Sequence, residues 1–407
     1  MLLNILTSQI YTNKTLIISG SKSETNRLLL LQALYPEICI ENRSTSDDSI
    51  LMHQALNSEL STLDIHHAGT AMRFLTAYFS IQEGKEVVLT GSERMKQRPI
   101  YILVDALKAL GASIEYMENP GFPPLKIKGK NLNNAKVSLE ANVSSQYISA
   151  LLLIAPKLPK GLEIEVKGKI TSRPYIEMTL QLLNKIGVET YFKENLIKVL
   201  PKKESNEPLH ITVESDWSSA SYYYSIIALS RLNTKIHLKY YQMHSLQGDS
   251  VLAELYEHFG VKTIYEQNGI TLTKYQNANS SITFDLNSCP DIAQTIAVTA
   301  FALGLPCSLY GLHTLKIKET DRLSALKTEI EKLGGNVTIT KEAIHIQASS
   351  HINPQVTLET YNDHRMAMAF APLALKSSLQ INHAEVVSKS YPGFWEDLKS
   401  IGFQITQ

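Results

Sequence analysis

The feature of this sequence that most constrains its fold is a pattern repeated along the whole chain. An apolar run ends in a hydrophobic residue and a glycine, and a short stretch rich in β-forming residues follows. The five copies are LKALGASIEY, LNKIGVETYF, YEHFGVKTIY, IEKLGGNVTI and LKSIGFQITQ. Their glycines, Gly111, Gly187, Gly260, Gly334 and Gly402, are 76, 73, 74 and 68 residues apart, and each suits the left-handed position that ends a helix. The pattern predicts repeating units of about 70 residues.

A second set of expected helices alternates with the first. Each begins with small or polar residues and continues as an apolar run; the copies begin near Ser23, Thr70, Ser145, Ser219, Asp291 and Asp363. The first interval is short, which predicts a trimmed first unit whose glycine helix end is lost around residues 52–64. Segments such as EVVLTG, LEIEVKG, KIHLKYY and CSLYGL are typical of strands. The fold class is therefore α/β, and six units most simply form two domains of three units each.

Composition excludes several other classes of protein. The 407 residues include 39 Lys and Arg against 39 Asp and Glu, a balance that excludes an obvious binder of nucleic acid or of a membrane surface. The first residues do not have the pattern of a signal peptide, and no apolar run reaches the roughly 18 residues that a membrane span needs. The three widely spaced cysteines argue against a disulfide framework or a structural zinc site. We expect a soluble protein of the cytoplasm.

Cations recur at the expected helix starts, where positive charge is unfavourable. A helix N-terminus carries about half a positive charge and unpaired N–H groups, so a cation there costs roughly 0.3–1 kcal/mol. Capping explains the serines, threonines and aspartates at these places, but it does not explain the cations. The cations are Lys22, Arg27, Arg98, Lys318, Arg322, Arg365 and Lys389. Their placement in both halves of the chain predicts a site for a polyanionic small molecule.

Two acidic residues complement these cations. Glu319 stands between Lys318 and Arg322, and Asp291 follows Cys289-Pro290. Carboxylates among cations are candidates for proton transfer, with a structural ion pair as the alternative. The histidines lack the spacing of a metal site, and neither a complete phosphate-binding loop nor a G-x-G-x-x-G motif is present, so we expect no metal and no bound nucleotide.

Ten segments, in order along the chain, resemble the 5-enolpyruvylshikimate-3-phosphate synthase (3-phosphoshikimate 1-carboxyvinyltransferase) family. They are GSKSETNR, HAGTAMR, GSERMKQRPI, SSQY, SRPY, DWSSASYYY, PDIAQT, KETDRL, YNDHRMAM and KSYPGFWEDL. The resemblance implies transfer of the enolpyruvyl group of phosphoenolpyruvate to the 5-hydroxyl of shikimate 3-phosphate, with release of phosphate, in the shikimate pathway to chorismate and the aromatic amino acids. It implies a monomer that needs no cofactor.

The same resemblance implies an inside-out α/β barrel in each of two similar domains, built from three βαβαββ units, with the active site in the cleft between the domains. From the phase of the repeats and the family's discontinuous arrangement, we expect residues 1–14 and 215–407 to form the first domain and residues 15–214 the second. The polar, proline-bounded stretch 201–208 supports the second crossing.

The resemblance also implies roles for individual residues. Those expected to bind shikimate 3-phosphate are Lys22, Ser23, Arg27, Ser144, Ser145, Gln146, Ser172, Tyr175, Asp291 and Lys318. Those expected to bind phosphoenolpyruvate are Lys22, Gly69, Arg98, Gln146, Arg322, Arg365 and Lys389. Asp291 resembles the proton acceptor for the attacking hydroxyl, and Glu319 resembles the group that protonates the enolpyruvyl methylene; Lys22 completes the catalytic set.

The chain departs from the family's pattern at three positions, and two other functions stay open. His67 stands where the family usually has Asn, Phe74 where Pro is common, and Thr314 where Asn is frequent. The sister enzyme that acts on UDP-N-acetylglucosamine shares the architecture, but it typically uses a loop cysteine, and residues 91–99 contain none. A non-catalytic anion-binding relative is the other alternative, which the presence of both candidate acids and Lys22 disfavours.

Overall fold

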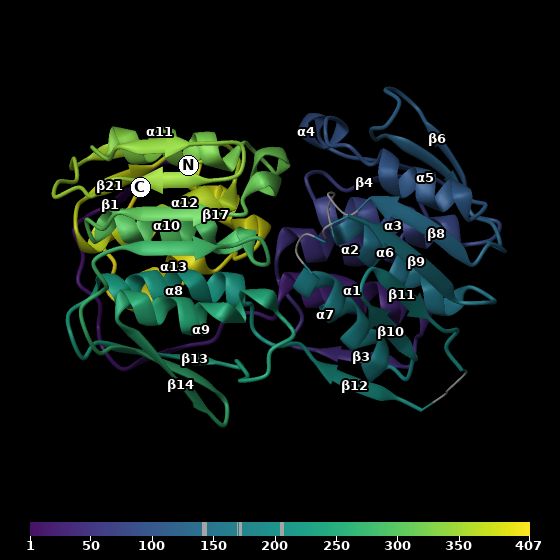
Figure 1. Ribbon diagram of the computed structural model, residues 1–407, viewed down its shortest axis with the longest axis horizontal. Coiled ribbons are helices and arrows are strands. Elements are labelled where there is room, and N and C mark those ends of the chain that lie inside the picture. The colour runs from purple at the N-terminus through teal and green to yellow at the C-terminus, as the bar shows by residue number, and fades with distance from the viewer. Residues whose placement is uncertain (141–144, 169, 171–172, 204–206) are drawn as a thin grey trace. The chain divides into compact units, whose positions relative to one another are not determined.

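The computed structural model describes residues 1–140, 145–168, 170, 173–203 and 207–407 (Figure 1). The chain divides into a first unit, Met1–Gly20 with Glu214–Gln407, and a second unit, Ser21–Val213. The first boundary falls after Gly20, further along the chain than the expected residue 14. The reason is that strand β2 (Lys14–Leu16) pairs in parallel with β13 (Lys235–Lys239) and so belongs to the first unit.

Small sheets are the repeating element of both units, and the described residues form six of them. In the first unit the sheets are β20 (Val356–Leu358), β21 (Leu379–Ile381), β1 (Leu3–Ile5), β22 (Ile405–Thr406); β14 (Val261–Glu266), β15 (Gly269–Lys274), β13, β2; and β16 (Ile282–Asp285), β17 (Cys307–Tyr310), β19 (Ile344–Ile346), β18 (Val337–Ile339). In the second unit they are β10 (Thr190–Lys193), β11 (Leu196–Val199), β9 (Leu162–Lys167), β8 (Lys136–Glu140); β4 (Thr62–Asp64), β5 (Glu86–Thr90), β7 (Leu125–Lys128), β6 (Ser113–Tyr116); and β12 (Leu209–Thr212), β3 (Ile38–Glu41). Three sheets in each unit confirm the count of six repeats.

Each sheet contains one parallel pair, and two further antiparallel strands extend that pair in five of the six; these two strands form a hairpin in four sheets, whereas in the fifth they are β1 and β22. In one sheet, β16 and β17 run parallel with Ile282 opposite Cys307, and β19 and β18 add antiparallel pairs. A parallel pair needs a crossover connection, which the helices supply, and a hairpin needs only a short turn. The pairing reproduces the βαβαββ unit. The sixth sheet has only the parallel pair β12–β3, as expected of a trimmed first unit.

In each unit three largely buried, interior helices pack against one another. The interior helices are α8 (Trp217–Leu229), α10 (Ala293–Ala302) and α12 (His364–Phe370) in the first unit, and α1 (Lys22–Leu34), α3 (Gly69–Ser80) and α6 (Ser145–Ile154) in the second. The other helices are α2 (Asp47–Leu56), α4 (Glu93–Lys96), α5 (Tyr101–Ala109), α7 (Arg173–Lys185), α9 (Leu252–Leu255), α11 (Arg322–Lys332) and α13 (Phe394–Ser400). The short 3₁₀ turns are η1 (Ala155–Lys157), η2 (Gly248–Val251), η3 (Tyr256–Phe259), η4 (Pro290–Ile292), η5 (His313–Ile317), η6 (Ala371–Leu375) and η7 (Ala384–Lys389).

The sequence of α8 explains why it is interior. Every residue of this helix except Ser218 is buried, because its side chains are apolar or small on all faces. Its hydroxyls are paired with those of α10: Ser221 Oγ lies 3.0 Å from Thr295 Oγ1, and Thr299 Oγ1 donates to Ser225 Oγ at 2.8 Å. Polar groups are tolerated in this core because they are hydrogen-bonded.

The predicted helix ends are confirmed. All five repeat glycines have a positive φ, and they follow α5, α7, η3, α11 and α13. At Gly260, where φ is 73°, an added Cβ would lie 2.0 Å from the carbonyl oxygen of Gln276, so only glycine fits. No helix in the described part of the chain is long and apolar enough to cross a membrane.

Candidate functional site

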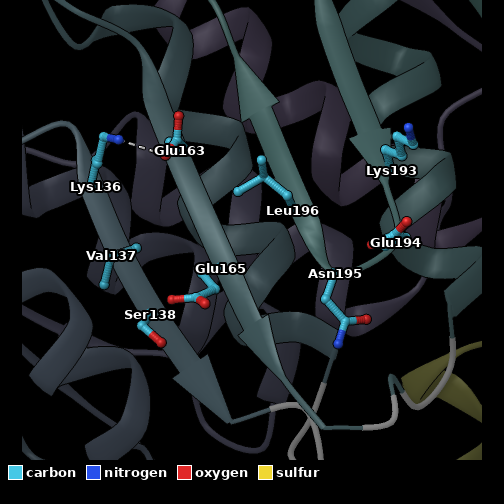
Figure 2. A pocket seen from close by; sticks show the side chains of 9 residues that line it. All are labelled: Lys136, Val137, Ser138, Glu163, Glu165, Lys193, Glu194, Asn195 and Leu196. Carbon is cyan, nitrogen blue, oxygen red and sulfur yellow. Dashed lines mark ion pairs between the residues drawn. The ribbon is translucent and has the colours of Figure 1, made fainter.

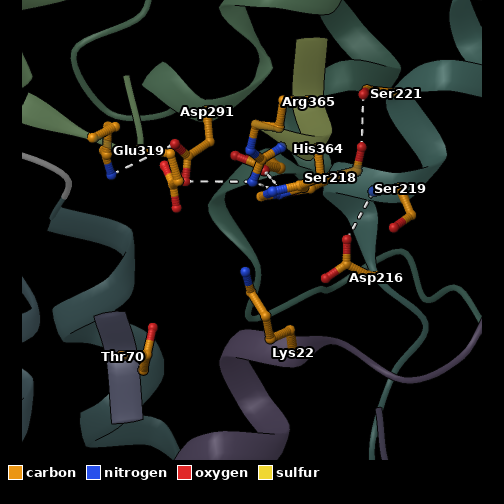
Figure 3. A network of polar contacts seen from close by, with 12 residues as sticks. Lys22, Thr70, Asp216, Ser218, Ser219, Ser221, Asp291, Glu319, His364 and Arg365 are labelled. Atoms are coloured by element: carbon orange, nitrogen blue, oxygen red, sulfur yellow. Dashed lines mark hydrogen bonds and ion pairs between the residues drawn. The ribbon is translucent and has the colours of Figure 1, made fainter. Parts of the chain in front are cut away.

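A charged cluster in the first unit includes Asp291, Glu319 and Arg365 (Figure 3), and a second, buried arginine is its centre. Arg322 is the first residue of α11 and only 2 % of it is exposed. Its Nη1 lies 2.9 Å from Asp291 Oδ1, its Nη2 lies 2.9 Å from Glu319 Oε2, and its Nε lies 2.6 Å from Asp363 Oδ2. Each of its three nitrogens therefore has a carboxylate partner, which fixes the plane of the guanidinium group.

Three further cations approach the same carboxylates. Lys389 Nζ lies 3.0 Å from Glu319 Oε1, Lys318 Nζ lies 3.6 Å from Asp291 Oδ1, and Arg365 Nη2 lies 3.5 Å from Asp291 Oδ2. These side chains come from η7, from the segment before α11 and from the first turn of α12. Four cations thus surround Asp291, Glu319 and Asp363, and the excess positive charge favours binding of an anion.

The electrostatics keep Asp291 ionised. Burial alone would raise the pKa of Asp291, but the nearby charges of Lys318, Arg365 and Arg322 outweigh burial and hold it well below its usual range. Burial lowers the pKa of Arg322, but the charges of Asp363, Glu319 and Asp291 have the larger effect and hold this pKa above its ordinary value. The cluster therefore contains a carboxylate that can accept a proton only when part of the surrounding positive charge is neutralised.

Helix starts carry the candidate residues of the second unit. Lys22 is the first residue of α1, whose N-cap Ser21 accepts a hydrogen bond from Glu24 N, and Lys22 Nζ lies 3.6 Å from Asp48 Oδ2. Gln146 Nε2 donates to Thr70 Oγ1 at 3.2 Å, which joins the starts of α6 and α3. The N–H groups of these neighbouring helix starts make this end of the second unit suitable for an anion.

Arg27 is buried between three helices, with 2 % of it exposed. Its nitrogens donate to Thr179 Oγ1, Ser149 Oγ and the carbonyl oxygens of Ser23 and Tyr175, at 2.7–3.2 Å. Burial lowers the pKa of Arg27 to about 10. These partners are neutral oxygens, so Arg27 links α1 to α6 and α7 and keeps a positive charge that they do not neutralise.

The guanidinium of Arg98 lies over the start of α3. An added Cβ at Gly69 would be 2.6 Å from Arg98 Nη1, so this close approach requires glycine. Arg73 holds the two segments together, because its Nη1 donates to the Gly69 carbonyl at 3.2 Å and its Nη2 to the Pro99 carbonyl at 3.1 Å. Tyr147 also donates to the Pro99 carbonyl, at 2.5 Å. The position of Arg98 is thus determined by contacts around Pro99.

The structure gathers the expected residues into two sets, one in each unit. The set in the first unit is Asp291, Lys318, Glu319, Arg322, Arg365 and Lys389; the set in the second is Lys22, Ser23, Arg27, Gly69, Arg98, Ser145, Gln146 and Tyr175. Ser144 and Ser172 lie outside the described residues. Sequence reasoning missed Asp363, Arg73 and Asp48. The sequence did contain a clue to Asp363. It is an acid directly before the helix start that carries Arg365, and such an acid does more than cap the helix when a second cation lies near it.

Two other candidate features give no site. Among the described residues, no group of three or more His, Cys, Asp or Glu side chains could hold a metal ion. A hollow on the β8–β9–β11–β10 sheet is lined by Lys136, Val137, Ser138, Glu163, Glu165, Lys193, Glu194, Asn195 and Leu196 (Figure 2). Lys136 and Glu163 form an ion pair at 2.8 Å there, with 78 % of the lysine side chain exposed. Solvated charges of both signs do not select a ligand.

Comparison with known proteins gives the family. The family model described as EPSP synthase (3-phosphoshikimate 1-carboxyvinyltransferase) matches residues 54–398. The chain belongs to the EPSP synthase family. Within this family, a 3-phosphoshikimate 1-carboxyvinyltransferase of Bacteroides fragilis is 46% identical over 395 residues, which cover 96% of each chain, and one of Colwellia psychrerythraea is 35% identical over 419 residues, covering 96% of this chain and 97% of the other.

Solved structures show the same fold. The EPSP synthase of Acinetobacter baumannii superimposes with a TM-score of 0.81 at 20% identity and covers 100% of both chains. The enolpyruvyl transferase NikO of Streptomyces tendae superimposes with a TM-score of 0.75 at 13% identity and covers 100% of this chain and 98% of its own. These matches confirm the expected inside-out α/β architecture of the EPSP synthase family.

One departure from the family's sequence pattern lies beside a candidate site residue. Phe74 is fully buried in α3, and its ring centre lies 5.3 Å from the guanidinium carbon of Arg27. The ring of Tyr175 lies 5.9 Å from the same carbon. Aromatic faces attract a cation without neutralising it. Phe74 therefore helps this member of the family to keep a buried, charged arginine.

Proposed function

We propose that this chain catalyses the 3-phosphoshikimate 1-carboxyvinyltransferase reaction, in which the enolpyruvyl group of phosphoenolpyruvate passes to the 5-hydroxyl of shikimate 3-phosphate and phosphate is released. Full-length relatives with this name support the proposal. The observation that carries it is the pair of carboxylates, Asp291 and Glu319, held by one buried guanidinium group at 2.9 Å each. The reaction needs one proton acceptor and one proton donor beside an anion site, and this pair supplies both.

The proposed roles follow the reaction. Asp291 accepts the proton of the 5-hydroxyl as its oxygen bonds to C2 of phosphoenolpyruvate. Glu319, which must be protonated in the complex with both substrates, delivers a proton to the C3 methylene. The product of this addition is a tetrahedral intermediate that carries both a phosphate and a carboxylate group. Glu319 then takes a proton back from C3 while the C2–O bond to phosphate breaks, which restores the enol double bond. The departing phosphate takes the proton that Asp291 accepted, so both carboxyl groups end the cycle as they began it.

Binding of the substrates would also activate Asp291. The cations near Asp291 hold its pKa far below the usual range, which makes the free carboxylate a weak base. The carboxylate and phosphate groups of phosphoenolpyruvate would neutralise part of the charge on Arg322, Arg365 and Lys389 and so raise the pKa of Asp291. Proton acceptance therefore becomes favourable only when the substrate is bound.

The second unit would supply the remaining contacts. Lys22, Ser23, Ser145 and Tyr175 are proposed to bind shikimate 3-phosphate, and Arg27 contributes its buried charge. The residues of this unit that are proposed to bind phosphoenolpyruvate are Lys22, Gly69, Arg98 and Gln146. A cytoplasmic location fits the three unpaired cysteines.

The assay is phosphate release by the purified protein. We expect release from phosphoenolpyruvate in the presence of shikimate 3-phosphate and none with either compound alone. UDP-N-acetylglucosamine is the control acceptor. Equal release with that acceptor would assign the chain to the sister activity, and no release with either acceptor would favour the non-catalytic alternative.

A further inference from the structure

Arg365 has a hydroxyl partner that is itself bonded to a buried acid. Arg365 Nη2 donates to Ser218 Oγ at 3.2 Å (Figure 3). Ser218 Oγ in turn donates to Asp249 Oδ2 in a short hydrogen bond. Ser218 is the second residue of α8, and Asp249 lies in η2 with 4 % of it exposed. We propose that Ser218 and Asp249 are positioning residues, which orient the guanidinium of Arg365 for phosphoenolpyruvate; this inference rests on the function proposed above.

The direction of the hydrogen bonds makes Asp249 necessary. A guanidinium group can only donate, so Ser218 Oγ must accept from Arg365 through a lone pair. The serine hydroxyl has one hydrogen, and an acceptor is needed on its other side to keep that hydrogen away from the arginine. Asp249 Oδ2 is this acceptor. Loss of Asp249 would leave the hydroxyl free to rotate, and Arg365 would lose a fixed partner.

The partner of Arg365 is the uncharged hydroxyl of Ser218, which suits an arginine that must keep its charge. Arg322 is paired with three carboxylates at 2.6–2.9 Å, whereas the ion pair of Arg365 with Asp291 is longer, at 3.5 Å. A serine hydroxyl orients a guanidinium group without neutralising it. Asp249 therefore acts on Arg365 through the serine hydroxyl as well as through its own charge.

Burial of the Asp249 carboxyl group costs free energy, and a merely structural position would not require this cost. Its Oδ1 is buried with no hydrogen-bond partner in the described part of the chain. Burial and the nearby charge of Asp291 raise the pKa of Asp249 to about 6, against the opposing effects of Arg365 and Ser218. An apolar side chain would avoid this desolvation penalty. A carboxyl group retained at such a place indicates that its acceptor oxygen is used.

The test compares two deletions with two conservative replacements. Ser218→Ala and Asp249→Ala should each raise the KM for phosphoenolpyruvate about tenfold, as expected for loss of a hydrogen bond to a charged group. The KM for shikimate 3-phosphate should change less than twofold. Ser218→Thr and Asp249→Asn, which keep the hydroxyl and an acceptor oxygen, should restore most of the loss. If all four variants have the wild-type KM for phosphoenolpyruvate, the proposal is wrong.

Ser221→Ala is the matched control. Ser221 lies on the same helix and is fully buried, and its hydroxyl donates to the Ser218 carbonyl at 2.6 Å. We expect this variant to have both KM values of the wild type, as judged beside its thermal unfolding midpoint. An increase in the KM for phosphoenolpyruvate equal to that of Ser218→Ala would show that the effect comes from disturbing α8, and it would overturn the proposal.

A double-mutant cycle separates positioning from general structure. In an Arg365→Lys background, Ser218→Ala should change the KM for phosphoenolpyruvate less than twofold, because the group that it positions is gone. A further tenfold loss would contradict the proposal.

The proposed function can fail separately. If the wild-type protein releases no phosphate with shikimate 3-phosphate, that function falls, and binding of inorganic phosphate is measured instead. Weaker phosphate binding by Ser218→Ala than by Ser221→Ala would still support positioning of Arg365, whereas equal dissociation constants would refute it.

Discussion

Arg322 Nε and Asp363 Oδ2 lie 2.6 Å apart, and the Asp363 side chain is completely buried. The other oxygen of Asp363 accepts the backbone N–H of Arg365 at 2.9 Å and so caps α12. One carboxylate thus joins the guanidinium of one substrate-binding candidate to the backbone of another. Its loss should affect folding as well as activity.

We predict that Asp363→Ala lowers the free energy of unfolding by about 3–5 kcal/mol, because it leaves the Arg322 charge buried with one partner fewer. Urea denaturation monitored by circular dichroism measures the change. The control is Asp321→Ala, which removes the N-cap of α11, where Asp321 Oδ1 accepts from Ser324 N at 3.1 Å. That loss should be only ~1 kcal/mol. Equal losses would mean that the Arg322–Asp363 pair adds nothing beyond a cap.

Gly69→Ala should weaken binding of phosphoenolpyruvate with little effect on stability. The new Cβ would lie 2.6 Å from Arg98 Nη1, so the guanidinium must move. A displaced charged contact costs about 1.5–3 kcal/mol, which predicts a KM for phosphoenolpyruvate raised at least tenfold. Gly393→Ala is the control, since its nearest neighbour would be an ordinary 3.8 Å away. An unchanged KM in Gly69→Ala would show that Arg98 does not bind this substrate.

Asp291→Asn should lower kcat by a factor of about 100 or more, as expected for loss of a general base. The KM values should change less, because the amide keeps the volume of the side chain. Steady-state phosphate release measures both constants. Asp285→Asn is the matched control, an exposed acid whose Oδ1 accepts from Asn287 N at 3.0 Å. A kcat close to that of the wild type would assign Asp291 a structural role.

The stability of the protein should depend on pH through Asp249. Its pKa is raised to about 6, so between its unfolded pKa and this value the folded state binds a proton that the unfolded state has released. Protonated Asp249 therefore adds roughly 3 kcal/mol to the free energy of unfolding below about pH 4, and this contribution is lost as the pH rises to about 6. The Asp249→Asn variant should not show this fall in the free energy of unfolding.

The measurement is urea denaturation of wild type and Asp249→Asn at intervals from acid to neutral pH, under conditions in which both are folded. The difference between their free energies of unfolding should grow in favour of Asn as the pH rises and become constant above about pH 7. A difference that is independent of pH would show that Asp249 titrates alike in the folded and unfolded states.

The fold could be predicted because its signals are local. Gly260 and the other repeat glycines end their helices through their own φ angles, and α8 reveals its buried position through its own composition. The partners of the site residues are a different matter. Ser218 and Arg365 are 147 residues apart in the chain, and Asp363 looks like an ordinary N-cap until Arg322 is placed beside it. Only tertiary packing determines such pairs.

Arg27 shows the limit of assigning a role from a motif. Its place near the start of α1 predicted a substrate contact, but its own donors are directed to Thr179, Ser149 and two carbonyl groups. Its neighbouring sequence contains only the Ser23 acceptor, because α6 and α7 supply the other three. That Arg27 also touches a substrate remains a prediction.

The pairing of β1 has a consequence for synthesis of the protein on the ribosome. Leu3 and Ile5 face Ile381 and Leu379 of β21, and Asn4 and Ile5 face Thr406 and Ile405 of β22. The second unit has all of its strands once residue 212 has been made, and it can begin to fold while translation continues. Strand β1 must instead wait, unpaired, until β21 and β22 have been made.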